Sequence, residues 1–222
     1  MNATEESSLL IEKFEGGPIW TTGYLVYDSM SLDGIVIDVP LWTSENMYRR
    51  ISEMGIKIKS IVATHGHWDH IGEMGKLKSL VQSTVVAHKA DEWMMGDPNG
   101  MVIAPPEKIE PVHVDIRVVD GSRLEAGSLR FDVIHTPGHS AGSICIYEEN
   151  EKILFTGDTL FAGSIGRTDL PTGSFEEIVQ SISTKIMMLP EDVRIFPGHG
   201  RDSTLMQERT ENQFVQMMFA EK

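Results

Sequence analysis

Four side chains that can bind a metal ion lie within six residues of one another. The segment reads THGHWDH over residues 64–70, and its potential ligands are His65, His67, Asp69 and His70. Imidazole nitrogens and carboxylate oxygens are ligand types that suit Zn²⁺, Fe²⁺ or Mn²⁺. The chain has 8 histidines in 222 residues, so three of them beside an acid at these offsets fit a solvated turn poorly. The segment therefore predicts a metal site.

Three further potential ligands stand where apolar strands are expected to end. Each follows a strand and a glycine: His139 in TPGH, Asp158 in FTGD and His199 in FPGH. A rigid sheet that holds polar groups at its strand ends is a common way to build an active site. Each residue taken singly could be structural. With the first segment, however, they supply seven ligands, which are enough for two metal ions.

Taken together, the seven residues resemble the pattern of the metallo-β-lactamase superfamily. That pattern is His-x-His-x-Asp-His followed by a distant His, an Asp and a final His, and the similarity extends from the strand ending in Asp38 to the loop at Gly198. The resemblance implies an α/β fold, a four-layer αββα sandwich of mixed sheets with the site at one edge. It also implies that one metal ion is bound by His65, His67 and His139, and the other by Asp69, His70 and His199, with Asp158 as the bridge.

The chemistry that this resemblance implies is metal-dependent hydrolysis. Two divalent ions are expected, Zn²⁺ in the first place, with Fe or Mn as alternatives. A water that bridges them has a pKa lowered towards neutrality, so that hydroxide attacks an acyl carbon while a metal stabilises the oxyanion. Asp69 is the predicted catalytic residue, because it would orient this nucleophile as well as bind metal. Asp38 is either a hydrogen-bond partner of a histidine ligand or a turn residue before Pro40.

A second segment narrows the branch of the family. Residues 160–169, LFAGSIGRTD, resemble the glyoxalase II-like and persulfide dioxygenase-like members, and a bridging Asp158 fits them better than true β-lactamases. The favoured interpretation is a short glyoxalase II-like thioesterase acting on a small acyl thioester or a related anionic substrate. Only 23 residues follow His199, whereas glyoxalase II has an extra helical domain that helps bind glutathione. We therefore expect the thioesterase chemistry to carry over better than the glutathione preference.

Several other functions remain open at this stage. A persulfide dioxygenase would use a single iron on His65, His139 and Asp158, and it can show the same seven-ligand pattern. Lactonases share the metal pattern as well. A non-catalytic metal-binding scaffold would be expected to lose ligands, and none is missing here. A rival from another class is a serine hydrolase, since residues 138–142 match G-x-S-x-G around Ser140. A strand rather than a helix is expected after Ser140, which argues against that rival.

Some residues have two interpretations. Arg167 either forms a buried pair with Asp169 that shapes its loop, or binds a substrate carboxylate near the metal ions. Trp68 packs in the core or against the site. The Met94-Met95 pair fills the core or lines an apolar substrate pocket.

The elements that must position these residues alternate between strands and helices. Residues 96–111 hold two glycines and four prolines and predict a long surface loop, such as a substrate lid. Ser44 and Ser174 are candidate helix N-caps, and Gly55 is a stop signal. The last helix is expected to pack on the body or to form a dimer contact. Strands are predicted at 8–14, 21–28, 34–39, 58–64, 84–88 and 192–196, with several more between 114 and 157, and helices at 44–54, 72–82, 89–95, 174–188 and 203–219.

Composition limits the rest. Lys plus Arg is 19 and Asp plus Glu is 33, so the formal charge is −14, which disfavours a nucleic-acid partner. The single cysteine, Cys145, excludes an intramolecular disulfide and a cysteine-cluster zinc site, and its strand-like surroundings predict a buried thiol. We see no signal peptide and no transmembrane run, which predicts a cytoplasmic protein without a membrane partner. The sequence predicts one domain over residues 1–222, as a monomer or homodimer.

Overall fold

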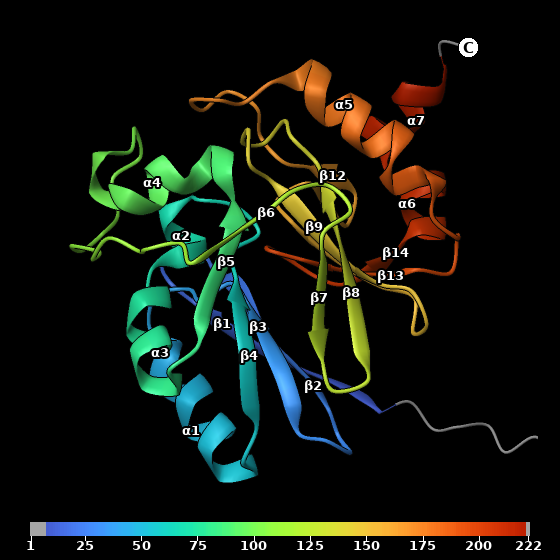
Figure 1. Ribbon diagram of the computed structural model, residues 1–222. Helices are drawn as coiled ribbons and strands as arrows, with labels where there is room; N and C mark the ends of the chain where they lie inside the picture. Colours follow the sequence, from blue (N-terminus) through green and yellow to red (C-terminus); the bar gives the residue numbers. More distant parts are fainter. Residues whose placement is uncertain (1–7, 221–222) are drawn as a thin grey trace, which may run out of the picture.

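Two six-stranded sheets pack face to face, and helices cover the outer side of each (Figure 1). The computed structural model describes residues 8–220 of the chain. Its layers follow the order helix, sheet, sheet, helix, which confirms the predicted αββα class. Residues 1–7, where the sequence predicts no signal peptide, lie outside the described residues.

The first sheet is mixed and comes from the N-terminal half. Its first three strands pair antiparallel and the remaining pairs are parallel. All eight residues of the second strand are buried, because the other sheet covers one face and helices cover the other. In sheet order, the strands are β1 (Leu9–Gly16), β2 (Thr21–Asp28), β3 (Asp33–Ile37), β4 (Lys57–Val62), β5 (Thr84–His88) and β6 (Ile116–Val118).

The second sheet comes from the C-terminal half and is mostly antiparallel. Its one parallel pair joins β10 and β13, the two strands that precede Asp158 and His199. A short hairpin of β11 (Leu160–Phe161) and β12 (Ser164–Ile165) stands beside it. In sheet order, its strands are β14 (Ser203–Thr204), β13 (Arg194–Pro197), β10 (Ile153–Gly157), β9 (Ile144–Glu148), β8 (Leu129–His135) and β7 (Arg123–Ala126).

The helices bury one apolar face each. In α1, Met47 and Ile51 lie one turn apart and face the first sheet, and Gly55 ends the helix in the left-handed conformation at φ 70°. Thr43 occupies the N-cap position, one residue before the predicted Ser44. The first sheet is covered by α1 (Ser44–Met54), α2 (Trp68–Ile71), α3 (Met74–Val81) and α4 (Glu92–Gly96), and the second by α5 (Phe175–Thr184), α6 (Leu205–Glu211) and α7 (Gln213–Ala220).

Three apolar layers hold the sandwich together. The central layer lies between the sheets, where Tyr24 of the first meets Phe155 and Phe196 of the second edge to face, with ring centroids 5.1 and 6.0 Å away. The two phenylalanine rings are tilted against each other at 5.4 Å. The two outer layers lie between each sheet and its helices. Cys145 is fully buried in the outer layer of the second sheet, as predicted. Burial raises the pKa of its thiol to about 11.

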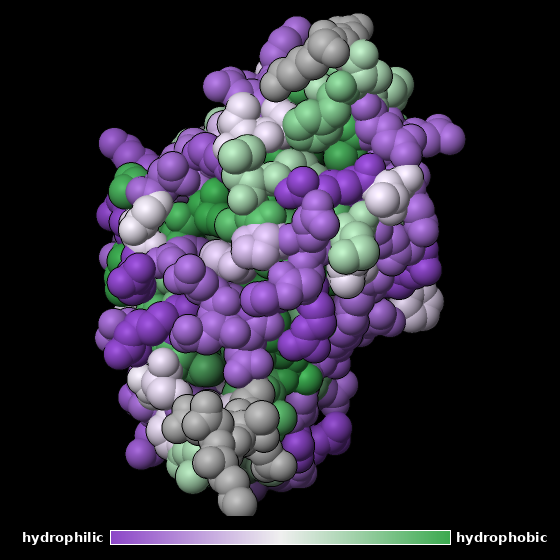
Figure 2. Space-filling view, turned by 90° about the vertical axis from the view of Figure 1, so that its right-hand side faces the viewer, coloured by the Kyte–Doolittle hydropathy of each residue, from purple (hydrophilic) through white to green (hydrophobic). Residues whose placement is uncertain are grey.

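The C-terminal segment differs from the single helix predicted over 203–219. It forms β14, then α6 and α7, with a break at Asn212, whose backbone is extended. The Asn212 side chain accepts the N–H of Phe214 at 3.0 Å and donates to the backbone oxygen of Ser164 at 3.0 Å. Figure 2 shows apolar side chains gathered at the upper end of the molecule, where α7 lies in Figure 1. Val215 of α7 is buried against the body, whereas Met217 and Phe219 stay exposed.

Two other predictions concern helices. The helix predicted over 174–188 ends at Thr184 and is followed by a 3₁₀ turn, Ile186–Met188. Ser174 caps it as predicted, because its hydroxyl accepts the N–H of Glu177 at 3.3 Å. Within residues 8–220, every helix is too short or too polar to cross a lipid bilayer.

Candidate metal centre

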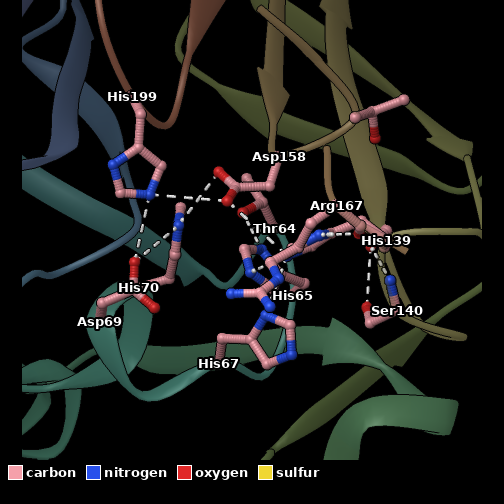
Figure 3. Close-up of polar contacts among 12 residues, drawn as sticks. Thr64, His65, His67, Asp69, His70, His139, Ser140, Asp158, Arg167 and His199 are labelled. Carbon is pink, nitrogen blue, oxygen red and sulfur yellow. Dashed lines mark hydrogen bonds and ion pairs between the residues drawn. The ribbon is translucent and has the colours of Figure 1, made fainter. Parts of the chain in front are cut away.

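All seven predicted ligands lie at one edge of the sandwich, where four strands end (Figure 3). The segment 65–70 follows β4 of the first sheet. His139, Asp158 and His199 follow β8, β10 and β13 of the second sheet. These three strands run in the same direction, because β9 is antiparallel to both β8 and β10, and β13 is parallel to β10. Their carboxyl ends therefore open towards the same place.

The local fold after β4 places its ligands on two sides. His67 is extended, with φ −66° and ψ 144°, and stands at the N-cap of the one-turn helix α2. Asp69 and His70 lie inside that turn, so their side chains point away from that of His67. One short segment therefore contributes to two neighbouring groups of potential ligands, as the family resemblance implies.

The first group consists of three imidazoles. His139 Nε2 lies 2.9 Å from His67 Nδ1 and 3.2 Å from His65 Nε2. His139 Nδ1 faces the backbone oxygen of Arg167 at 2.8 Å, which requires a hydrogen on that nitrogen. His65 Nδ1 faces the hydroxyl of Thr64, whose own hydrogen goes to a carboxylate. His139 Nε2 and His65 Nε2 therefore direct lone pairs at each other.

Protonation is disfavoured at two of these three rings, His65 and His67. Burial lowers the pKa of His67 to about 4, and it lowers that of His65 well below the usual range, helped by neighbouring histidines. Near pH 7 these two rings are neutral. Two acceptor nitrogens 3.2 Å apart repel one another unless a cation lies among them.

The second group combines a carboxylate with two imidazoles. Asp69 Oδ2 lies 3.3 Å from His70 Nε2 and 3.2 Å from His199 Nε2. Burial by itself would lower the pKa of His70, but Asp69, Asp158 and Asp38 outweigh it and raise that pKa well above its usual value. Burial would raise the pKa of Asp69, but His70 and His199 together hold it well below its usual value. In this group, the histidines favour ionised carboxylates, and the carboxylates favour a positive charge beside them.

Asp158 faces both groups. Its Oδ1 lies 3.2 Å from His70 Nε2, while its Oδ2 lies 3.6 Å from His139 Nε2 and 3.5 Å from His199 Nε2. Gly198 makes this approach feasible, because a Cβ there would lie 2.4 Å from Asp158 Oδ1 and 2.5 Å from His70 Cε1. Asp158 is thus in the position that a bridging ligand requires.

The arrangement fits two divalent cations. His70 Nε2 and Asp158 Oδ1 are buried and face each other without a hydrogen bond, which is unusual for buried polar atoms. The first group adds three imidazoles, in which His139 Nε2 lies within 3.2 Å of a ring nitrogen of each of the other two. Nitrogen and carboxylate oxygen donors in threes, each within 4.8 Å of one another, suit Zn²⁺, Fe²⁺ or Mn²⁺.

Asp38 acts as the hydrogen-bond partner of a ligand, the first of its two interpretations. Its Oδ2 accepts from His70 Nδ1 at 2.7 Å, which directs Nε2 towards Asp69 and Asp158. The same carboxylate accepts the backbone N–H of Thr64 at 2.8 Å and its hydroxyl at 2.7 Å. Asp38 has a φ of 57°, in the left-handed region, so the turn before Pro40 also has a backbone conformation that is unusual for a residue other than glycine.

Two supporting residues were missed in the sequence. Asp91 is buried and accepts the N–H groups of Gly66 at 2.9 Å and Gly142 at 2.7 Å, which join the loops that carry His67 and His139. Thr21 donates its hydroxyl to Asp69 Oδ2 at 2.8 Å. The only signal for Asp91 was its place just after a strand.

Ser140 does not have the surroundings of a nucleophile. Its hydroxyl donates to Asp91 Oδ2 at 2.6 Å and lies 2.8 Å from the hydroxyl of Ser143. The strand β9, rather than a helix, follows it from Ile144. The G-x-S-x-G match is therefore a structural turn.

Arg167 pairs with Asp169, but the pair is not buried as one interpretation expected. Its Nε and Nη2 donate to the two carboxylate oxygens of Asp169 at 2.7 and 2.8 Å, and the side chains are 51% and 69% exposed. The Arg167 side chain lines the cavity beside the ligands. Whether it binds a substrate carboxylate stays a prediction.

A cavity of about 470 Å³ opens over the ligands. The predicted loop 96–111 contributes to its wall through Met101, Val102 and Ile103. Trp68 fits both of its interpretations, since it is 6% exposed, packs in a small apolar cluster and also lines the cavity. Met94 lines the cavity, whereas Met95 belongs to the core.

Comparisons with known proteins agree with this geometry. The family model described as the metallo-beta-lactamase superfamily matches residues 31–199. Hydroxyacylglutathione hydrolase GloC of Haemophilus influenzae is 32% identical over 202 residues, which cover 86% of this chain and 91% of that protein. The crystal structure of BLEG-1, named a B3 metallo-beta-lactamase, has a TM-score of 0.85 at 31% identity and covers 93% of this chain and 99% of its own. That of TTHA1623 in a di-iron-bound form has a TM-score of 0.79 at 30% identity, with coverages of 91% and 99%.

Proposed function

The chain belongs to the metallo-beta-lactamase superfamily and is a metallo-hydrolase, and from this premise we propose that it hydrolyses acyl thioesters with two bound metal ions. The observation that carries the proposal is the pair of ligand groups that share Asp158 at the floor of a cavity. The relative named hydroxyacylglutathione hydrolase supports the choice of a thioester bond.

Each proposed ligand is assigned to one metal ion or to both. His65, His67 and His139 would hold one ion, Asp69, His70 and His199 the other, and Asp158 both. Zinc is proposed in the first place, with iron as the alternative because the relative TTHA1623 has a di-iron form. When bound, two divalent ions lower the pKa of a water to supply hydroxide near pH 7 and stabilise negative charge on the acyl oxygen.

Asp69 is proposed to orient the attacking water. It lines the cavity, and Thr21 and His199 hold its Oδ2, so its Oδ1 is left to accept a hydrogen bond from water. The water oxygen bonds to the acyl carbon, the C–S bond breaks, and the electron pair leaves on sulfur as thiolate. Asp69 can pass the remaining proton of the attacking hydroxide to that thiolate, so a carboxylate and a thiol are released.

The experiment combines metal analysis with three assays of reconstituted protein. We expect two metal ions per chain, and hydrolysis of S-lactoylglutathione or of a simple acetyl thioester that a chelator abolishes. One iron per chain with oxygen uptake on glutathione persulfide would contradict the proposal in favour of a persulfide dioxygenase. Turnover of a cephalosporin without turnover of thioesters would contradict it in favour of the activity that the name of BLEG-1 describes.

A matched pair of variants separates the metal site from general effects. His70→Ala removes a buried proposed ligand and should lower both the metal content and kcat/KM, the latter by more than about 100-fold. His113→Ala removes an exposed histidine remote from the ligands and should change neither. Equal behaviour of the two variants would exclude the assigned ligand set.

A further inference from the structure

The cavity over the metal centre is polar at its floor and apolar on its walls. The polar floor consists of ligand side chains such as Asp69 and His199. The walls come from segments far apart in the sequence: Ile19 between β1 and β2, Trp93 on α4, Val102 in the loop 96–111, and Phe161 on β11. A group bound next to the scissile bond would therefore contact mainly carbon.

Large apolar side chains at the mouth of this cavity remain in water. Trp93 and Ile19 are each 51% exposed, Ile103 is 43% exposed and Val102 is 74% exposed. Covering such surface releases free energy in proportion to the apolar area removed from water. Contiguous exposed apolar surface beside a polar centre is typical of a ligand site.

The charges on the walls are poorly suited to an anionic peptide thiol. Among the described lysines and arginines, Arg167 alone lines the cavity, and both its Nε and Nη2 already donate to Asp169. Glutathione carries two carboxylates, and a carboxylate loses its hydration at a high cost unless it gains a partner. Arg167 keeps its Nη1 hydrogens and one Nη2 hydrogen for one of these carboxylates, and the other would lack a cationic side chain from the wall.

The wall formed by the loop 96–111 is held in place. Asn99 accepts the N–H of Ile109 at 3.0 Å and donates to its backbone oxygen at 2.7 Å, which closes the loop on itself. Ile109 is buried against Trp68 and Leu41 in an apolar cluster with which Met101 packs. Met101, Val102 and Ile103 therefore form a preformed surface.

We propose that the substrates are thioesters that carry an apolar chain next to the scissile bond, rather than thioesters of an anionic peptide thiol. This inference rests on the proposed thioesterase function and names its substrate class. The apolar chain can belong to the acyl group or to the thiol, since either would lie on the same walls.

A chain-length series tests it directly. We would measure kcat/KM for acetyl, butanoyl, hexanoyl and octanoyl thioesters of the uncharged thiol N-acetylcysteamine, and for acetyl thioesters of thiols of increasing length. We expect kcat/KM to rise about fourfold for each added methylene until the cavity is filled. The rise should appear in the series, acyl or thiol, whose chain contacts the apolar walls. The hexanoyl thioester of N-acetylcysteamine should also exceed the hexanoyl thioester of glutathione.

Two valines provide a matched pair of variants. Val102 lines the cavity, whereas Val119 lies between β6 and β7 outside the lining and is 61% exposed. Val102→Asp should reduce the gain in kcat/KM to about twofold or less for each methylene. Val119→Asp should leave the whole series unchanged. Val102→Lys, in contrast, should raise kcat/KM for the glutathione thioester relative to that for the uncharged thioester.

The outcomes separate the two proposals. The apolar specificity would be overturned, with the thioesterase function intact, if thioesters were hydrolysed but kcat/KM did not change with chain length. The same would follow if the glutathione thioester were preferred at every length. Equal losses for short and long chains in Val102→Asp would overturn it as well. Absence of hydrolysis of any thioester by protein with two metal ions would instead overturn the proposed function itself.

Discussion

Asp91 joins two loops that carry proposed ligands, and it does so without touching a ligand side chain. Its carboxylate accepts two backbone N–H groups and the hydroxyl of Ser140. Asp91→Ala should leave these buried donors unpaired, lower the free energy of unfolding by about 3 kcal/mol and weaken metal binding. Urea unfolding and a metal-competition titration would measure the two effects.

The control for this variant is Asp192→Ala, which removes an exposed carboxylate paired with Lys152. It should change the free energy of unfolding by less than about 0.5 kcal/mol and leave metal binding unchanged. If Asp91→Ala kept full metal affinity, the carboxylate would have a role in stability alone.

Ser140 provides the sharpest test between a metal mechanism and a serine mechanism. Ser140→Ala removes the 2.6 Å hydrogen bond to Asp91 and should cost about 2 kcal/mol of folding free energy. Turnover per folded, metal-loaded protein should stay within about twofold of the original, because the hydroxyl is not needed for attack. A steady-state assay after measurement of the folded fraction checks this, and complete loss of kcat would restore the triad interpretation.

At the scale of elements, Asp28 joins the end of β2 to the turn between β7 and β8. Its carboxylate accepts the hydroxyl of Ser128 at 2.7 Å and its N–H at 3.0 Å, and also the N–H of Met30 at 2.8 Å. These bonds hold the pKa of Asp28 well below its usual range. The ionised carboxylate therefore stabilises the contact between the two sheets.

Asp28→Asn should lower the free energy of unfolding at pH 7 by about 2 kcal/mol. A depressed native pKa stabilises the fold above the unfolded-state pKa, about 3.9, and this contribution is lost as the pH falls below it. The difference between the two proteins should thus shrink from pH 4 downwards. Urea unfolding from pH 7 to pH 3 measures it, with the exposed Glu53→Gln as a charge-matched control, and a constant difference would contradict the assignment.

Elements that depend on local signals could be predicted, and those that depend on distant partners could not. The helix Ser44–Met54 ends at Gly55, as the sequence predicts. The metal site could be predicted because four residues of ligand type, His65, His67, Asp69 and His70, lie close together in the sequence. The break at Asn212 depends on Ser164, which is 48 residues away. Asp91 likewise bonds Gly142, 51 residues away, so no local pattern marks its role.

At the scale of the whole molecule, polar contacts connect the two sheets at both ends of β2. At one end Asp28 bonds Ser128, and at the other the N–H of Thr22 donates to the backbone oxygen of Gly198 at 2.8 Å, beside the ligand groups. The proposed ligands come from the carboxyl ends of β4 in the first sheet and of β8, β10 and β13 in the second. Bound metal ions would thus link the two halves of the sandwich.

This linkage predicts that metal removal destabilises the whole sandwich rather than one loop. Ions that bind the folded chain alone should raise its free energy of unfolding by about 2.7 kcal/mol for each site at 100 times the dissociation constant. Thermal unfolding should be followed at several free-zinc concentrations by a signal from each half. Both signals should show the same transition, with a midpoint temperature that rises with the zinc concentration. His70→Ala should weaken the shift and His113→Ala should keep it. If a chelator loosened only residues 65–70, the two sheets would be held together without the metal ions, which would then contribute to the chemistry and not to the stability of the fold.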